Sequence, residues 1–140
     1  MSTRPRVLFV CVKNGGKSQM AAALMMKAVG EAIDVDSAGT QPGTAVNGLS
    51  AQALLEVGLD ISANVPKLAT DALIQQSDVV VVLGREAVLD RGDGPSVVRW
   101  DTVEPSERGI DGIERMRMIR DDIKARVEQL AEELHPPVVS

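Results

Sequence analysis

The sequence contains very few of the residues that build several common kinds of site. Its 140 residues include one cysteine, one phenylalanine and one tryptophan, and tyrosine is absent. A single cysteine excludes a disulfide within the chain and suits a reducing compartment, so we expect a cytoplasmic protein. With so few aromatic side chains, the core must be filled by Val, Leu, Ile, Met and Ala.

The chain also lacks the patterns of nucleic-acid-binding and membrane proteins. Its net charge is −5 and no basic run is interleaved with aromatic residues, so nucleic acid is not an expected partner. No apolar stretch approaches the ~20 residues that span a bilayer, so no membrane association is expected. The length and a hydrophobic fraction of 44% predict a single globular domain over residues 1–140.

The most informative stretch runs from Val7 to Ser18 and reads VLFVCVKNGGKS. Its apolar part, residues 7–12, predicts a buried strand. The loop that follows holds two glycines, and an Ala-, Met- and Leu-rich segment from about Lys17 to Ala32 predicts a helix. In such a strand–loop–helix unit, the N–H groups of the loop and of the helix N-terminus converge and bind anions.

Cys11, the only cysteine, lies at the start of this loop. A thiolate there would be stabilised by the loop dipoles and by Lys17, and it would lie against a bound tetrahedral oxyanion, which indicates covalent catalysis. Taken alone, a cysteine after an apolar strand is more often a small buried hydrophobic residue. The spacing of Cys11, Asn14, Lys17 and Ser18 is much more specific than any one of them.

The rest of the chain alternates predicted strands and helices. The apolar strand at 78–83 must be central, because both of its faces are hydrophobic. The alternation predicts an α/β three-layer sandwich, with a parallel sheet flanked by helices and a ligand site at the carboxyl ends of its strands. The other elements are strands at 33–37 and 96–100, helices at 50–57 (capped by Ser50), 71–76 (capped by Thr70 or Asp71) and 113–134, and a loop or short helical turn at 87–95.

The segment CVKNGGKSQMA, from Cys11 to Ala21, resembles the phosphate loop of low-molecular-weight protein tyrosine phosphatases. It is more similar to the arsenate reductases built on that fold, and most similar to their actinobacterial single-cysteine branch, the arsenate–mycothiol transferases. The resemblance extends through DSAGT at 36–40, the strand at 78–83 and WDTVEP at 100–105. It implies the fold of this phosphatase family, with a four-stranded parallel sheet.

Chemistry and resemblance together assign roles to particular residues. Cys11 is the nucleophile, and Ser18 hydrogen-bonds its sulfur and helps to keep it ionised. By resemblance, Asn14 and Ser37 hydrogen-bond one another and support the loop. The oxyanion is expected to be bound by the Lys17 side chain and by the backbone N–H groups of Val12, Lys13, Asn14, Gly15, Gly16, Lys17 and Ser18.

The family's general acid is an Asp followed by Pro, and here the matching pair is Glu104-Pro105. We therefore assign Glu104 as the acid that protonates the leaving oxygen. Asp101 is the alternative acid, and either carboxylate could instead be a solvated loop residue.

The sequence departs from the family pattern at several positions. Lys17 replaces an arginine, which removes the planar bidentate fork and predicts weaker oxyanion capture. The further cysteines that thioredoxin-coupled relatives carry near Leu83 are missing, as are the tyrosines that flank the acid in the phosphatases. Ala22 stands where many reductases have a Glu involved in potassium binding, and we predict no metal site.

The leading functional prediction is arsenate detoxification. Cys11 attacks arsenate, a low-molecular-weight thiol takes the arseno group, and a redoxin completes the reduction to arsenite. Resemblance makes mycothiol the first choice of co-substrate, glutathione the second and mycoredoxin the redoxin partner, with no bound cofactor. The alternatives are a phosphatase of phosphotyrosine or small phosphate esters, and a non-catalytic oxyanion-binding module.

Overall fold

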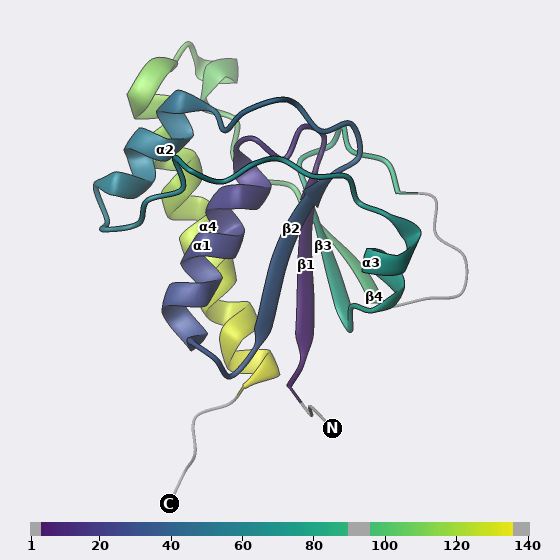
Figure 1. The fold of residues 1–140 in the computed structure, drawn as a ribbon. Helices are drawn as coiled ribbons and strands as arrows, with labels where there is room; N and C mark the ends of the chain where they lie inside the picture. The colour runs from purple at the N-terminus through teal and green to yellow at the C-terminus, as the bar shows by residue number, and fades with distance from the viewer. Residues whose placement is uncertain (1–3, 90–95, 136–140) are drawn as a thin grey trace, which may run out of the picture.

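The computed structural model describes residues 4–89 and 96–135 (Figure 1). Its strands form one four-stranded sheet in the order β2-β1-β3-β4, and every neighbouring pair is parallel. Both strands with apolar sequences, β1 and β3, are therefore internal, as predicted. The strands are β1 (Arg6–Cys11), β2 (Asp34–Gly39), β3 (Val79–Leu83) and β4 (Ser96–Trp100).

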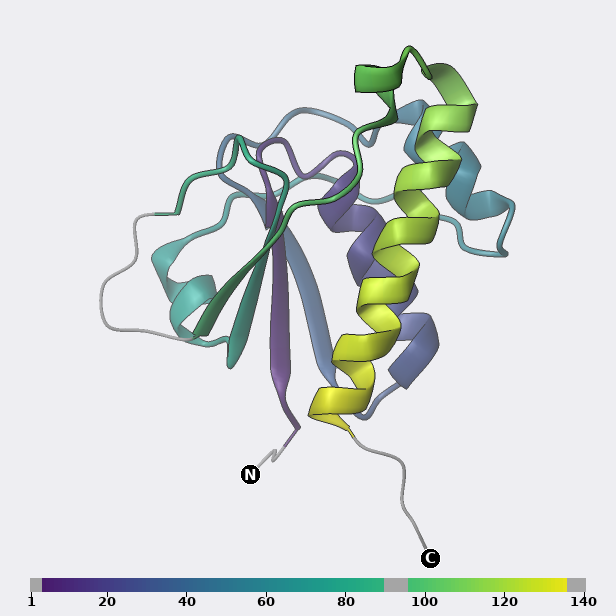
Figure 2. The same cartoon turned by 180° about the vertical axis from the view of Figure 1, so that it is seen from behind.

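Helices cover both faces of this sheet, which confirms the predicted three-layer arrangement. The helices α1, α2 and α4 lie on one side and the short α3 on the other (Figures 1 and 2). None of the described helices has the length and apolar character needed to cross a membrane. The helices are α1 (Lys17–Val29), α2 (Gly48–Leu55), α3 (Asp71–Gln75) and α4 (Gly112–Leu134), with a 3-10 turn η1 (Pro105–Arg108) before α4.

The central strand β1 separates two apolar clusters. Val7 and Phe9 point into the cluster under α1 and α4, whereas Leu8 and Val10 point into the cluster under α3. All four side chains are fully buried. Burial on both faces accounts for the unbroken apolar run, since a strand with one wet face would alternate apolar and polar residues.

The ends of several helices differ from the sequence predictions. Ser50 does not cap α2: the side chain of Asn47 accepts the backbone N–H of Ser50 at 2.9 Å, so Asn47 is the cap and the helix begins at Gly48. Asn is as good a cap as Ser, and the sequence offered both within one turn. Thr70 caps α3, as predicted. Of the predicted loop at 87–95, residues 90–95 lie outside the described residues.

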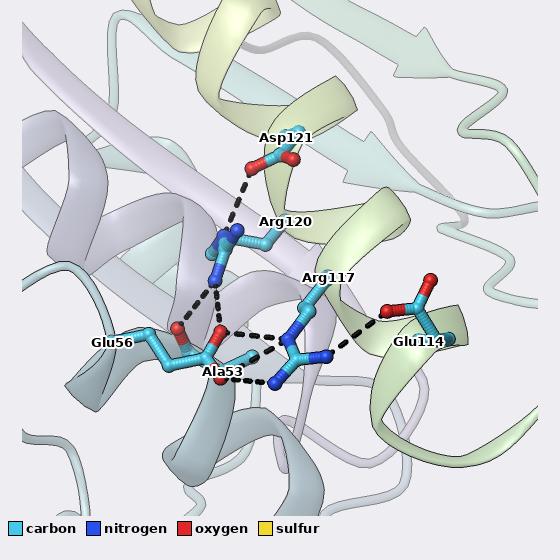
Figure 3. A network of polar contacts seen from close by, with 6 residues as sticks. All are labelled: Ala53, Glu56, Glu114, Arg117, Arg120 and Asp121. Atoms are coloured by element: carbon cyan, nitrogen blue, oxygen red, sulfur yellow. Dashed lines mark hydrogen bonds and ion pairs between the residues drawn. The ribbon is translucent and has the colours of Figure 1, made fainter.

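An ion-pair cluster fastens α4 to α2 (Figure 3). The carboxylate of Glu56 accepts hydrogen bonds from Arg117 at 2.6 Å and from Arg120 at 2.8 Å. Arg120 also donates to the carbonyl of Ala53 at 2.9 Å. The Arg117 hydrogen bond, followed by that of Arg120, lowers the pKa of Glu56 to about 2. The cluster fixes the first half of α4 beside α2, where both helices border the loop after β1.

The order of the strands determines where a ligand site can form. The chain leaves β1 for a neighbour on one side, β2, and later returns to the other side as β3. Such a switch point opens a crevice at the carboxyl end of the strand between them, because the two connections diverge there. Cys11 is the last residue of β1, so the nucleophile predicted from sequence lies at this crevice.

Candidate active site

The loop between β1 and α1 is held from outside by the segment that follows β2. Its carbonyl groups accept backbone N–H groups from this segment at distances of 2.7 to 3.0 Å. Because the carbonyl groups are engaged there, the loop N–H groups remain for a ligand on the inner side. The pairs, donor first, are Thr40 to Cys11, Gln41 to Val12, Gly43 to Lys13 and Asn47 to Gly15.

The loop N–H groups form an open set of donors. Asn14 donates its backbone N–H to the Cys11 sulfur at 3.2 Å. Within the described part of the chain the other amides have no protein acceptor, and a tetrahedral anion could satisfy several of them at once. These open donors are Val12, Lys13, Gly15, Gly16, Lys17 and Ser18. They are six of the seven amides assigned to oxyanion binding from sequence, and that role stays a prediction. The seventh, Asn14, donates to the sulfur in this structure.

Asn14 is the hub of the loop. It is fully buried, and its φ of 54° is in the left-handed region, which Asn tolerates better than most residues. Its amide nitrogen donates to Ser18 Oγ at 2.7 Å and to Ser37 Oγ at 3.1 Å. The hydrogen bond expected between Asn14 and Ser37 is therefore present. Together these bonds hold a strained backbone position in place.

Two further residues complete the support of Asn14, and sequence reasoning missed both. Gln19 donates to the Asn14 backbone carbonyl at 3.1 Å and to its side-chain oxygen at 3.3 Å. The backbone N–H of Lys67 donates to the same side-chain oxygen at 3.1 Å. Gln19 directly follows Ser18 and could have been found from its place in the motif. Lys67 could not, because only the fold brings it to the loop.

The Cys11 sulfur has two hydrogen-bond partners. Its Sγ lies 2.9 Å from Ser18 Oγ, in addition to the Asn14 backbone N–H. Asn14 already donates a hydrogen to Ser18 Oγ, which leaves the Ser18 hydroxyl hydrogen free to point at sulfur. Donors aimed at sulfur stabilise a thiolate over a thiol. The expected contact between Ser18 and the nucleophile is thus present.

Gly39, at the end of β2, permits a close approach between the end of β2 and the loop after β1. A Cβ at this position would lie 2.6 Å from the Val12 carbonyl oxygen and 3.0 Å from Asn14. No side chain fits there without moving the backbone of the loop, because contacts under 3 Å are repulsive. In the sequence Gly39 stands out only as part of the DSAGT motif, and the structure gives the reason that it must be glycine.

Lys17 lines two cavities beside the loop. One, of about 620 Å³, is also lined by Lys13, Gly15 and Gly16. The other, of about 280 Å³, is lined by Glu104 and other residues that follow β3 and β4. The ammonium group makes no hydrogen bond or ion pair within the described part of the chain, and it lies 3.6 Å from where a Gly84 Cβ would be. The Lys17 ammonium group is therefore available to an anion between the loop and the segment that carries Glu104.

Glu104 is tightly paired in the structure. Arg115 donates Nε to one carboxylate oxygen at 2.7 Å and Nη2 to the other at 2.6 Å. The Arg115 hydrogen bond, supported by Ser106, lowers the pKa of Glu104 to about 2. The carboxylate is therefore ionised at neutral pH, whereas a general acid has to carry a proton. Glu104 as the acid stays a prediction, and it requires that Arg115 move away.

Asp101, the alternative acid, is in the same situation. Arg85 donates Nε and Nη2 to its two oxygens at 2.9 and 2.8 Å, and this hydrogen bonding lowers the pKa of Asp101. Both carboxylates line the smaller cavity with Lys17. The topology thus brings both candidates to the cavity beside Lys17, and each is held by its own arginine.

Ala22, which stands where many members of the resembled family have a Glu involved in potassium binding, lines a third cavity. This cavity, of about 590 Å³, is also lined by Asn14, Asp36 and Lys67. Lys67 Nζ lies 2.6 Å from the Asp36 carboxylate. Among the described residues, no group of three or more His, Cys, Asp or Glu side chains could hold a metal ion.

Comparison with known proteins agrees with this geometry. The family model described as low molecular weight phosphotyrosine protein phosphatase matches residues 6–91. An arsenate reductase of Brevibacillus brevis is 30% identical over 135 residues, covering 94% of this chain and 98% of the relative.

Two solved structures extend the comparison. A thioredoxin-dependent arsenate reductase of Corynebacterium glutamicum is 33% identical with a TM-score of 0.78, and the match covers 95% of this chain but only 63% of that one. An arsenate reductase of Archaeoglobus fulgidus is 28% identical with a TM-score of 0.74, covering 89% of this chain and 97% of that one. The chain belongs to the low molecular weight phosphotyrosine protein phosphatase family, and it is an enzyme of that family.

Proposed function

We propose that this protein reduces arsenate by passing the arseno group from Cys11 to a low-molecular-weight thiol. The observation that carries the proposal is the Cys11 sulfur with its two donors, set against open loop amides. Arsenate is a tetrahedral oxyanion that fits such a cradle, and its arsenic is attacked by thiolates. The relatives named as arsenate reductases support this choice of oxyanion.

The reaction proceeds in balanced steps. The Cys11 thiolate forms a bond to arsenic while one As–O bond breaks, and the departing oxygen takes protons and leaves as water. A small thiol then displaces Cys11 from arsenic and carries the arseno group away. A second thiol attacks the sulfur of that adduct, which forms a disulfide and releases arsenite. The two electrons that reduce arsenic come from the two thiols.

The number of cysteines decides where these electrons come from. The chain has one cysteine, so it cannot close an internal disulfide for thioredoxin to reduce. The Corynebacterium structure is described as thioredoxin-dependent, and this chain has to work differently from any enzyme that uses several of its own cysteines. Mycothiol is the proposed co-substrate, with glutathione as the alternative and mycoredoxin as the redoxin partner. A supply of reduced thiol makes the cytoplasm the proposed location.

Steady-state turnover with defined redox partners tests the proposal. Arsenate-dependent NADPH oxidation should occur with mycothiol, mycoredoxin and mycothiol reductase, and it should be absent with thioredoxin and thioredoxin reductase alone. Mass spectrometry of the working enzyme should find a Cys11 adduct and no intrachain disulfide. Sustained turnover with the thioredoxin system alone contradicts the transfer mechanism. Turnover with glutathione and glutaredoxin instead corrects only the identity of the thiol.

A phosphatase is the second candidate, because a loop that binds arsenate also suits phosphate and the matched family is a phosphatase family. In the described parts of the chain no aromatic residue lines either cavity beside Lys17, so no ring among them stacks on a phosphotyrosine. We therefore expect hydrolysis of phosphotyrosine and of p-nitrophenyl phosphate to be much slower than arsenate turnover. The reverse order of the two activities would favour the phosphatase.

A further inference from the structure

Arg115 lies in the first turns of α4, directly beside the loop. It lines the larger cavity together with Lys13, Gly15, Gly16 and Lys17. The packing of its neighbour Met116 shows how close this end of α4 is to the loop. Met116 Sδ accepts a hydrogen bond from Ser50 Oγ at 3.4 Å, and the same oxygen would lie 3.2 Å from a Cβ at Gly16.

The charge of this cavity suits an anion. Among the residues that the structure describes, its charged lining residues are Lys13, Lys17 and Arg115, and none of them is a carboxylate. Arg115 contributes the one guanidinium among them. A guanidinium donates two parallel hydrogen bonds to a tetrahedral oxyanion, whereas an ammonium acts as a point charge. The planar fork that is missing at Lys17 is thus present on the wall of the same cavity.

In the absence of a ligand, Arg115 uses this fork on Glu104. Both side chains are 29% exposed, so water reaches the pair and the guanidinium can exchange one anion for another without unfolding. Arg120 on the same helix is different, because its side chain is only 11% exposed and is fixed to Glu56 and Ala53 (Figure 3). Arg115 is therefore placed to move, and Arg120 is not.

We propose that Arg115 binds the oxyanion held in the loop, and that its pair with Glu104 is the resting alternative to this contact. The inference rests on the proposed function, since it assumes that the loop binds arsenate. It also explains how Glu104, which is ionised while paired with Arg115, can become protonated and act as the general acid. When Arg115 turns to the oxyanion, Glu104 loses its strongest partner and can take up a proton. That proton then passes to the oxygen that leaves arsenic as the bond to Cys11 forms.

Binding of inorganic phosphate, measured by titration calorimetry on the full chain, tests this without turnover. We expect Arg115→Gln to weaken phosphate binding by roughly tenfold to a hundredfold, the effect of losing a charge-assisted fork. Arg115→Lys should bind phosphate with an affinity between those of the wild type and Arg115→Gln. This variant keeps the test decisive if Arg115→Gln does not fold. Arg117→Gln is the matched control, because Arg117 is on the same helix and pairs with Glu56 and Glu114 away from the cavity (Figure 3). It should bind phosphate within about twofold of the wild type.

A second pair of variants tests whether Arg115 contacts the oxyanion and whether Glu104 competes with the oxyanion for Arg115. Glu104→Gln should tighten phosphate binding by a few-fold, because a neutral amide holds Arg115 less strongly. Adding Arg115→Gln to Glu104→Gln should then weaken binding at least about tenfold, although no carboxylate is left unpaired. Folded Arg115 variants that bind phosphate like the wild type overturn the inference and leave the proposed function standing. A wild type that binds neither phosphate nor arsenate overturns both.

Discussion

The loop around Cys11 and the segment that carries Glu104 face the same crevice but are held by different forces. Neutral hydrogen bonds organise the loop, with Asn14 and Ser18 both fully buried. Charged guanidinium forks from other elements hold the carboxylate segment, and Glu104 and Arg115 remain 29% exposed. The nucleophile is therefore preorganised, whereas the proposed acid can be rearranged by a charged ligand.

Loss of the nucleophile should have the largest effect. We expect Cys11→Ser to lower kcat for arsenate reduction by at least about ten-thousandfold, because a hydroxyl at this site is far less ionised and less nucleophilic. The variant should keep its melting temperature and its phosphate binding, since serine fits the same hydrogen bonds. Stopped-flow assays with mycothiol and mycoredoxin measure the loss. A Ser variant with near wild-type turnover removes Cys11 from the mechanism.

Loss of the proposed acid should come next. We expect Glu104→Gln to slow the step in which oxygen leaves arsenic by roughly a hundredfold to ten-thousandfold, the usual range for general acid catalysis. Formation of the Cys11 adduct in a single turnover, followed by rapid quench and mass spectrometry, measures this step directly.

The comparison variant for this acid is Asp101→Asn. Asp101 is paired with Arg85 in the same bidentate geometry, in a more exposed ion pair. We expect Asp101→Asn to stay within a few-fold of the wild type. A large loss in Asp101→Asn together with a nearly silent Glu104→Gln would transfer the acid role to Asp101.

The difference between the loop and the segment that carries Glu104 also explains which features of the site could be predicted from the sequence alone. Cys11 and Ser18 belong to one short motif, so their contact could be predicted from the sequence, and resemblance to the family predicted the bond between Asn14 and Ser37. The parallel sheet followed from apolar runs separated by helical segments, and only details such as the cap of α2 were wrong. The pair between Glu104 and Arg115 could not be predicted, because α4 carries several arginines and only the packed helix decides which one reaches the carboxylate.

Disruption of the loop support should have an intermediate effect. We expect Asn14→Ala to lower kcat/KM by roughly tenfold to a hundredfold and to destabilise the fold by about 2 to 4 kcal/mol. It removes the side-chain partner of Ser18, of Ser37 and of the Lys67 backbone N–H, and it puts alanine at a left-handed φ. Urea denaturation and steady-state kinetics measure the two effects. Asn64→Ala is the control, since Asn64 touches the network only through Gln19.

Restoration of the family arginine should change activity only slightly. We expect Lys17→Arg to lower KM for arsenate by a few-fold, because the guanidinium fork adds one hydrogen bond to the oxyanion. The gain is small if Arg115 already supplies such a fork, and it should grow in the Arg115→Gln background. Steady-state kinetics on the four variants of this cycle measure the coupling. An equal gain in both backgrounds would mean that Arg115 and Lys17 act independently.

A change of pH should affect the segment that carries Glu104 and leave the loop around Cys11 unchanged. The neutral network of Asn14, Ser18 and Ser37 contains no group that titrates in acid. Glu104 does titrate, and its pKa in the folded protein is lowered from 4.5 to about 2, chiefly by Arg115. The pair therefore adds its full stability above about pH 4.5 and loses it as the pH falls through about 2.

Carboxyl carbon NMR of Glu104 gives the direct measurement. We expect its midpoint near 2 in the wild type and much closer to the ordinary 4.5 in Arg115→Gln, because the largest cause of the shift is then removed. Saturation with phosphate should raise the wild-type midpoint as well, since Arg115 then leaves Glu104 for the oxyanion. The Asn14 side-chain amide resonances should stay unchanged over the same pH range. A Glu104 midpoint that phosphate does not move would show that the carboxylate and the loop are held separately.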